Sequence, residues 1–328
     1  MKKRIALLFG GESSEHEVSV MGYQYMRSLL TETIYDILPV YIDRRGKWLV
    51  GGTDGVDAHL TARGGVDTDY GFIGIDAAIP LLHGEGGEDG SLQGALDKAG
   101  IPYVGADVLT SAVCTDKFYT QSVAASLGIP TVKSVIFSRA TDTDSAYRLC
   151  LDRLGLPLFV KPRRLGSSIG AYPVYDRTDF FDCFPKAMEK GGGLVTAEML
   201  VREKRELECA FCEAGGRRLI TPPGEVLVDG FYGYSEKYGG ETKVLPRADV
   251  DTEVGERIVK YSEMLADALS LRHLARIDFF LSGEEVLFNE VNTFPGFTRE
   301  SLYPKMLEAA GISVREAILS FIRDALGC

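Results

Sequence analysis

Apolar positions along the chain recur in short blocks of β-branched and aromatic residues, each followed by a turn signal. The first block, residues 5–9, runs into Gly10-Gly11 and then into a helical pattern that extends to Leu30. Similar blocks follow at residues 37–42 and 77–82. A strand, a glycine turn and a helix in succession open a doubly wound α/β domain, whose ligands gather at the carboxyl ends of the strands. The pattern therefore predicts a parallel-sheet domain at the N-terminus.

The rest of the first third contains weaker signals. A helix is predicted over residues 91–99 and a short strand over residues 101–104. Residues 53–70 are rich in glycine and aspartate, which predicts a mobile surface insertion. His83 opens a turn of glycines and acids that is costly to order unless a ligand binds there, although a histidine bonded only within the turn is the alternative. Glu15 is explained equally well by helix capping and by substrate binding.

The middle of the chain carries two lysines and a glycine-serine loop. Lys117 lies in a helix-rich segment, and Lys161 ends a short apolar strand that leads into Gly166-Ser167-Ser168. The N–H and O–H groups of such a loop are suited to folding over phosphates. The Walker and protein-kinase signatures are both absent from the sequence. Glu198 and Glu206 lie in the next predicted strands, where they either bind an adenine and a ribose or face water at a sheet edge.

The strongest candidate chemistry lies in a predicted hairpin with strands at residues 277–281 and 286–291. Asp278 lies on the first strand, Glu290 and Asn292 belong to the second, and hairpin pairing brings the three onto one face. Three hard oxygen donors favour Mg²⁺ held between the protein and substrate phosphates. The alternative is a pair of solvated acids on an edge hairpin. It is disfavoured because both strands are strongly apolar, where an unpaired charge is expensive.

Length and composition limit the class of protein. The chain has 328 residues, of which 45% are hydrophobic and 25% charged, as in a globular protein of two or three domains. The formal net charge of -11 argues against nucleic acid or an anionic membrane as a partner. The sequence has no signal peptide and no apolar run of the ~20 residues that a membrane helix needs, so we expect a cytoplasmic protein. Cys209 and Cys212 form a lone C-x-x-C, which favours buried strand thiols over a zinc or redox site.

Several long stretches of the sequence match one family in order. They are F-G-G-E-S-S-E-H-E-V-S, L-H-G-E-G-G-E-D-G-S-L-Q-G, F-V-K-P-R-R-L-G-S-S-I-G, F-Y-G-Y-S-E-K-Y, A-R-I-D and N-E-V-N-T-F-P-G-F-T-R-E-S-L-Y-P. Along nearly its whole length the chain resembles the D-alanine:D-alanine ligases of the ATP-grasp superfamily, and it is also similar to the D-alanine:D-serine ligases. The resemblance implies a three-domain ATP-grasp fold of the α/β class, α+β in parts. Its domains are an N-terminal α/β substrate domain at residues 1–110, a central ATP-grasp domain at residues 111–200, and a C-terminal ATP-grasp domain with the metal site and lid at residues 201–328.

The resemblance also implies the activity and the roles of individual residues. ATP, with Mg²⁺ or Mn²⁺, would phosphorylate one D-alanine, and a second would attack the D-alanyl phosphate to give a peptidoglycan precursor; the protein is expected to be a homodimer. The implied nucleotide-binding residues are Lys117, Lys161, Ser168, Glu198, Glu206 and Lys237. The implied metal ligands are Asp278, Glu290 and Asn292. The implied catalytic residues are Glu15, Ser167, Tyr238, Arg276, Gly296 and Ser301. The implied substrate-binding residues are Glu15, His83, Tyr232, Gly296, Ser301 and Leu302.

The second substrate stays open between D-alanine and D-serine. In the family, residues 231–238 would form a mobile lid, and their S-E-K-Y resembles both kinds of ligase. Leu302 follows Ser301, and an apolar residue there suits a methyl group better than a hydroxymethyl group, which favours D-alanine. Another alternative is an ATP-grasp ligase of the biotin-carboxylase or purine-pathway kind, which would share the lysines and metal acids but not E-H-E-V-S or the S-L-Y-P ending. The last alternative is a nucleotide sensor that has lost its chemistry, and the retention of Arg276, Asp278 and Glu290 argues against it.

Overall fold

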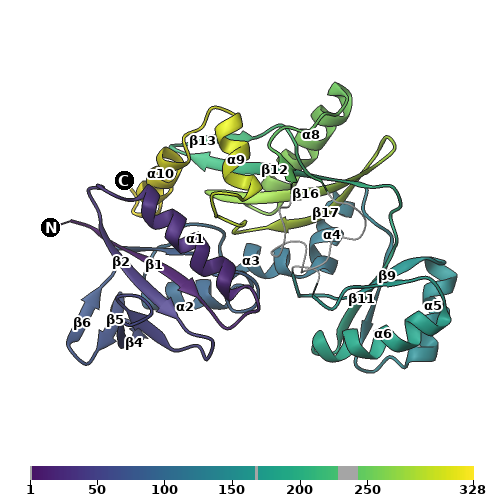
Figure 1. Cartoon of the computed structure of the whole chain (residues 1–328), viewed down its shortest axis with the longest axis horizontal. Coiled ribbons are helices and arrows are strands. Elements are labelled where there is room, and N and C mark those ends of the chain that lie inside the picture. The colour runs from purple at the N-terminus through teal and green to yellow at the C-terminus, as the bar shows by residue number, and fades with distance from the viewer. Residues whose placement is uncertain (1, 167–168, 228–242) are drawn as a thin grey trace.

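The computed structural model describes residues 2–166, 169–227 and 243–328, and the strands of these residues form three sheets (Figure 1). The helices are α1 (His16–Leu29), α2 (Ser91–Ala99), α3 (Val108–Thr115), α4 (Lys117–Ser126), α5 (Thr143–Arg153), α6 (Arg177–Lys190), α8 (Thr252–Ala268), α9 (Leu302–Ala309) and α10 (Val314–Ala325). The strands are β1 (Arg4–Gly10), β2 (Asp36–Ile42), β3 (Trp48–Val50), β4 (Val56–Thr61), β5 (Gly65–Thr68), β6 (Gly71–Gly74), β7 (Ala77–Pro80), β8 (Ser134–Ser138), β9 (Leu158–Pro162), β10 (Tyr172–Val174), β11 (Leu194–Met199), β12 (Arg205–Ala214), β13 (Arg217–Ile220), β14 (Gly224–Leu227), β15 (Lys243–Leu245), β16 (Leu274–Ser282) and β17 (Glu285–Asn292). In Figure 1 the first sheet lies at lower left, the second at lower right, and the third above them.

The first sheet has the strand order β6-β5-β4-β3-β2-β1-β7. Strand β1 pairs in parallel with both β2 and β7, which confirms the predicted parallel unit. Strands β3 to β6 then extend the sheet in antiparallel fashion, so the sheet as a whole is mixed. The prediction of a mobile insertion at residues 53–70 is wrong, because β4 and β5 pair with each other and bury Ala58 and Val66. The strand predicted at residues 101–104 is reduced to a single bridge between Ala78 and Tyr103.

Strand β1 is buried on both faces, which explains why it reads as a continuous apolar run. Leu7 and Phe9 belong to one core, which they share with Leu307 of α9 and Phe321 of α10. Leu8 belongs to a second core on the other face, together with residues of α2. The N-terminal sheet and the C-terminal helices therefore share one hydrophobic core, and both chain ends lie at the same end of the molecule (Figure 1).

The second sheet has the order β10-β9-β11-β8, and α5 and α6 pack on it around a core of its own. The third sheet has the order β15-β14-β12-β16-β17, with β13 beside β12. The predicted hairpin is confirmed as β16 and β17, whose register pairs Asp278 with Glu290 and Arg276 with Asn292. One face of this sheet packs against α8 through a separate core.

The predicted α/β class is confirmed, whereas the predicted domain boundaries at residues 110 and 200 stay a prediction. Cys209 and Cys212 are buried in β12 with free thiols, as predicted. Burial raises the pKa of each thiol to about 12. None of the helices in the described ranges is long and apolar enough to span a membrane.

Candidate active site

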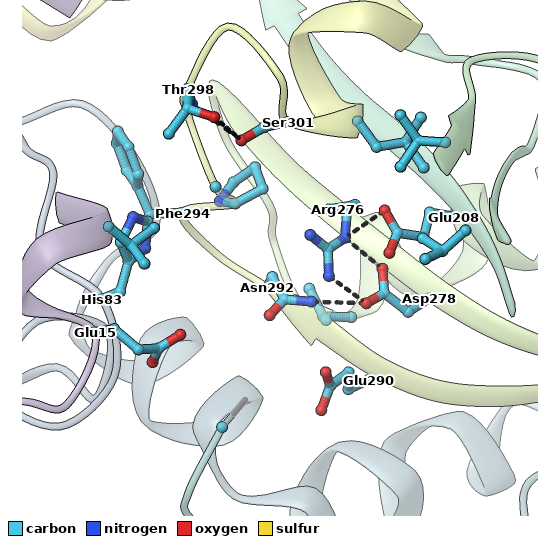
Figure 2. A pocket seen from close by; sticks show the side chains of 18 of the residues that line it. Glu15, His83, Glu208, Arg276, Asp278, Glu290, Asn292, Phe294, Thr298 and Ser301 are labelled. Atoms are coloured by element: carbon cyan, nitrogen blue, oxygen red, sulfur yellow. Dashed lines mark hydrogen bonds and ion pairs between the residues drawn. The ribbon is translucent and has the colours of Figure 1, made fainter. Parts of the chain in front are cut away.

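A cavity of about 1360 Å³ opens between the third sheet and the loops that follow β7 and β17. Strands β12, β14, β15, β16 and β17 form one wall, and residues of α1 line the other side. Figure 2 shows some of the side chains that line this cavity. The predicted site residues that line it are Glu15, His83, Lys117, Glu206, Arg276, Asp278, Glu290, Asn292, Gly296, Ser301 and Leu302.

Three carboxylates lie in one row across the third sheet. Glu208 of β12 pairs with Asp278 of β16, and Asp278 pairs with Glu290 of β17. Partners in an antiparallel register lie on the same face of a sheet, so the three side chains point to the same side. Arg276 and Asn292 form the next row on that face. The sheet thus concentrates acids around one guanidinium.

Arg276 is held by two of these carboxylates (Figure 2). Its Nε and Nη2 donate to Oδ1 and Oδ2 of Asp278 at 2.8 and 2.7 Å, and Oε2 of Glu208 lies 2.9 Å from the same Nε. Burial acts to lower the pKa of Arg276, but the charges of Asp278 and Glu208 outweigh it and hold the pKa well above its usual value. The guanidinium is therefore a permanent, oriented cation in the cavity wall.

The predicted metal ligands lie together on β16 and β17. The Nδ2 of Asn292 donates to Oδ2 of Asp278 at 3.0 Å, which leaves the amide oxygen directed away from that carboxylate (Figure 2). Across the described ranges of the chain, no cluster of three His, Cys, Asp or Glu side chains is arranged to hold a metal ion. Two carboxylates and one amide oxygen nevertheless fit Mg²⁺, which keeps water and phosphate oxygens as its other ligands.

Lys117 connects this row of acids to the predicted phosphate loop. Its Nζ donates to the carbonyl oxygen of Leu165 at 2.8 Å and lies 3.5 Å from Oε2 of Glu290. The side chain is buried at the start of α4. A lysine ammonium in this position places one positive charge between the loop and a candidate metal ligand.

Lys161 and Glu198 lie outside the lining of this cavity, on β9 and β11 of the second sheet. Their side chains form an ion pair of 2.6 Å, and Gln121 donates to the other carboxylate oxygen of Glu198 at 3.2 Å. Glu198 is only 4% exposed, so the alternative of a water-facing edge acid is wrong for this residue. Glu206 does line the cavity, where it pairs with Lys204 at 2.7 Å.

Glu15 is the N-cap residue of α1, but its side chain makes no capping hydrogen bond, so only the favourable position of an acid at the helix N-terminus is left of the capping interpretation. Its carboxylate instead approaches two glycines. A Cβ built on Gly84 would lie 2.9 Å from Oε2 of Glu15, and one built on Gly166 would lie 3.6 Å from it. Gly84 also has a positive φ of 70°, so both its conformation and the lack of a side chain are required there.

Glu88 is a site residue that the sequence did not distinguish from the other acids of its turn. Its two carboxylate oxygens accept from the backbone N–H groups of Gly84 and Phe294 at 2.9 and 3.2 Å, and Nδ1 of His83 lies 3.9 Å away. Burial, followed by the charge of Glu15, raises the pKa of Glu88 to about 8. Burial also lowers the pKa of His83, so the imidazole is neutral at pH 7.

Glu208 was missed as well, although a signal for it existed. It lies two residues after Glu206 in a predicted strand, and residues two apart on a strand share a face. The sequence therefore predicts that Glu206 and Glu208 share one face of β12. It does not predict that β12 lies beside β16, because this pairing joins segments that are far apart in the chain.

The loop after β17 forms the remaining part of the cavity. Oγ of Ser301 accepts from the N–H of Thr298 at 3.0 Å and lies 2.8 Å from the hydroxyl oxygen of Thr298. A Cβ on Gly296 would lie 3.2 Å from that Oγ, so the backbone approaches the serine closely. Leu302 begins α9 and is 5% exposed. The lid prediction for residues 231–238 and the roles assigned to Ser167, Ser168, Tyr232, Lys237 and Tyr238 lie outside the described residues.

Comparison with protein families gives two adjacent matches that together span most of the chain. The model described as the D-ala D-ala ligase N-terminus matches residues 4–106, and the model described as the D-ala D-ala ligase C-terminus matches residues 123–323.

Individual proteins that are similar to this chain along its whole length are also named as ligases of this kind. A D-alanine–D-alanine ligase of Deinococcus radiodurans is 38% identical, with 99% of each chain covered. The solved structure of D-alanyl-alanine synthetase A from Vibrio cholerae superposes with a TM-score of 0.91 at 34% identity, covering 100% of this chain and 99% of the other. The VanG D-Ala:D-Ser ligase from Enterococcus faecalis gives a TM-score of 0.89 at 32% identity, covering 99% of this chain and 100% of the other.

The three-sheet fold is thus that of an ATP-grasp enzyme that forms a bond between two substrates. Within that class, the chain belongs to the D-alanine–D-alanine ligase family.

Proposed function

We propose that this protein joins two molecules of D-alanine at the expense of ATP, forming D-alanyl-D-alanine, ADP and phosphate for peptidoglycan precursor synthesis. The observation that carries the proposal is that Lys117 of α4 lines the same cavity as Arg276, Asp278 and Glu290 of the β16–β17 hairpin. Membership of the ligase family supports the same reaction. Because the product is a peptidoglycan precursor, we propose a cytoplasmic location. From the family resemblance we also propose that the protein is a homodimer.

In the first step a carboxylate oxygen of D-alanine attacks the γ-phosphorus of ATP, which gives D-alanyl phosphate and ADP. We assign Lys117 and Lys161 to the phosphates of ATP, and Glu198 and Glu206 to its adenine and ribose. Asp278, Glu290 and Asn292 would hold Mg²⁺, which supplies positive charge next to the phosphates. Glu15 would accept hydrogen bonds from the ammonium group of the first D-alanine, beside a neutral His83.

In the second step the amine of the other D-alanine attacks the carbonyl carbon, and phosphate leaves with its bridging oxygen. Negative charge develops on the carbonyl oxygen, where Arg276 and the N–H of Gly296 would stabilise it most in the transition state. Ser301 would hold the carboxylate of the second substrate. Arg276 and the N–H of Gly296 would therefore stabilise the transition state more than the bound substrates.

The side chain of Leu302 supports D-alanine over D-serine as the second substrate. It is apolar and 5% exposed, so a serine hydroxyl placed against it would lose water without gaining a partner. That loss is worth about 1–3 kcal/mol, or ~10- to 100-fold in specificity. The chain is also similar to a D-Ala:D-Ser ligase, so the experiment offers both amino acids as second substrate.

The test is incubation of the purified protein with ATP, Mg²⁺ and equal concentrations of D-alanine and D-serine, with the dipeptides quantified by mass spectrometry. The proposal predicts mainly D-alanyl-D-alanine, with L-alanine inert as a control. A product that is mostly the mixed dipeptide would reassign the protein to the D-serine ligases. Binding of ATP with no dipeptide and no phosphate release would support the nucleotide sensor instead.

A further inference from the structure

Glu208 is a buried acid in the cavity for which the proposed reaction has no role. It lies in β12, is 8% exposed, and lines the cavity next to Arg276. Its Oε2 is 2.9 Å from Nε of Arg276, so the two side chains form an ion pair across adjacent strands. A buried carboxylate is expensive to maintain without a partner, so its placement here calls for an explanation.

Glu208 contacts the guanidinium of Arg276 at its Nε edge. Asp278 takes Nε and Nη2 of Arg276 in a bidentate pair, and Glu208 approaches the same Nε from the neighbouring strand. Figure 2 shows the third nitrogen, Nη1, pointing away from both carboxylates. The two acids therefore fix the Nε edge from two directions and determine where Nη1 points.

Asp278 alone is not sufficient to fix the orientation of the Arg276 guanidinium. It lies two residues from Arg276 on the same strand, it accepts from Asn292, and in the proposed reaction it also serves as a metal ligand. Glu208 belongs to a different strand, and its position in the row is fixed by the pairing of β12 with β16. It can therefore hold Arg276 in place while the oxygens of Asp278 change partners.

We propose that Glu208 is a positioning residue for Arg276, holding the guanidinium so that Nη1 faces the carbonyl oxygen that becomes negatively charged during ligation. A competing effect opposes this role, since a second carboxylate also weakens the positive charge of Arg276. Orientation is the larger effect because a displacement of about 1 Å at a reacting centre can reduce the rate ~100-fold. The inference rests on the proposed ligase activity.

The test compares Glu208→Gln with a matched control on the same sheet. Glu225 of β14 is also buried and forms a bidentate pair with Arg205, at 2.7 and 2.6 Å, but it does not line the cavity. Glu225→Gln therefore removes an equally buried charge away from the reaction. Glu208→Asp keeps the charge on a shorter side chain and serves as the partial rescue.

Four quantities are measured for each variant: kcat and KM for D-alanine, the Kd for ATP, and the Kd for a phosphinate analogue of the dipeptide with a tetrahedral centre. We expect Glu208→Gln to lower kcat and weaken analogue binding by the same factor, about 10- to 100-fold, with ATP binding unchanged. Glu208→Asp should recover part of the loss. Glu225→Gln should leave kcat and analogue binding at the wild-type level.

The outcomes separate this inference from the proposed function. A wild-type protein without ligase activity would overturn the proposed function itself. An active wild type with Glu208→Gln equally active, or with tighter analogue binding, would overturn only the positioning role. Equal weakening of ATP and analogue binding would also overturn it, because that pattern indicates general loss of structure.

Discussion

At the scale of single residues, burial decides the protonation of the groups around the cavity. Glu88 accepts two backbone N–H bonds, which favour its carboxylate, yet burial and the nearby charge of Glu15 raise its pKa to about 8. The same burial keeps His83 neutral by lowering its pKa. None of this was predictable from the turn sequence, because the acids of H-G-E-G-G-E-D-G differ only in how they are packed.

The raised pKa of Glu88 leads to a prediction about stability. The folded-state pKa of about 8 lies above the ordinary value of 4.5, so the unfolded chain releases the proton first. The contribution of Glu88 to stability is therefore present below about pH 4.5 and is lost as the pH rises to about 8. Urea unfolding at several pH values should show the wild type losing stability relative to Glu88→Gln over this range. Parallel curves for the two proteins would contradict the assignment.

A second residue-scale prediction concerns the candidate metal ligand Glu290. Glu290→Gln keeps the shape of the side chain but removes its charge, which should weaken Mg²⁺ binding with nucleotide and reduce kcat by about 100-fold, equivalent to ~3 kcal/mol. Glu285→Gln, at the exposed start of the same strand, is the control and should be near wild type. Circular dichroism should be unchanged for both. Normal turnover of Glu290→Gln at saturating Mg²⁺ would remove Glu290 from the ligand set.

At the scale of elements, the sequence predicted what local patterns determine. The β16–β17 hairpin was predictable because two apolar strands flank a turn, and its register follows from that turn. The pairing of β12 with β16 was not predictable from the sequence, so Glu208 was not identified as the third acid of the row. Residues 53–70 were misread because their glycines and aspartates concealed the alternation that buries Ala58 and Val66.

The start of α4 gives a prediction at this scale. Asp116 is 2% exposed, and its carboxylate accepts two hydrogen bonds from Arg163, both of 2.7 Å. It also accepts one hydrogen bond from Arg164 at 2.9 Å and one from the backbone N–H of Phe118. It thus joins α4 to the segment before the predicted phosphate loop. Asp116→Ala leaves buried Arg163 unpaired and should cost about 3 kcal/mol of unfolding free energy. It should also raise the KM for ATP, because Lys117 follows directly.

The control for this prediction is Asp107→Ala at the start of α3. Asp107 caps its helix by accepting from the N–H of Thr110 at 2.8 Å, without a buried arginine partner in the described contacts. Its loss should cost only about 1 kcal/mol and leave the KM for ATP unchanged. Equal losses for the two variants in chemical denaturation would show that the contacts of Asp116 with the arginines contribute nothing beyond helix capping.

At the scale of the whole molecule, the distribution of cores determines which parts unfold together. The N-terminal sheet and the C-terminal helices share one core, whereas the second sheet has its own. The sequence predicted the elements of each third but not this sharing, because contacts between β7 and α10 leave no local pattern. The ion pair between Lys161 and Glu198, just outside the lining of the cavity, has the same origin, because it joins residues that are far apart in the sequence.

Hydrogen exchange should reveal this division. Phe184→Ala removes a buried ring from the core of the second sheet, and Phe321→Ala removes one from the shared core, each at a cost of about 3–5 kcal/mol. We expect Phe184→Ala to speed exchange mainly in β8 to β11, and Phe321→Ala to speed it in both β1 and α10. Faster exchange throughout the chain in both variants would contradict separate cores.

The central claim is that a carboxylate oxygen of D-alanine is phosphorylated in this cavity before the peptide bond forms. The direct measurement uses D-alanine whose carboxylate is labelled with ¹⁸O, with ATP and Mg²⁺ in unlabelled water, and mass spectrometry of the released phosphate. Because phosphate leaves with the bridging oxygen of D-alanyl phosphate, the account predicts one labelled oxygen in each phosphate formed. Unlabelled phosphate released in step with the dipeptide would contradict it.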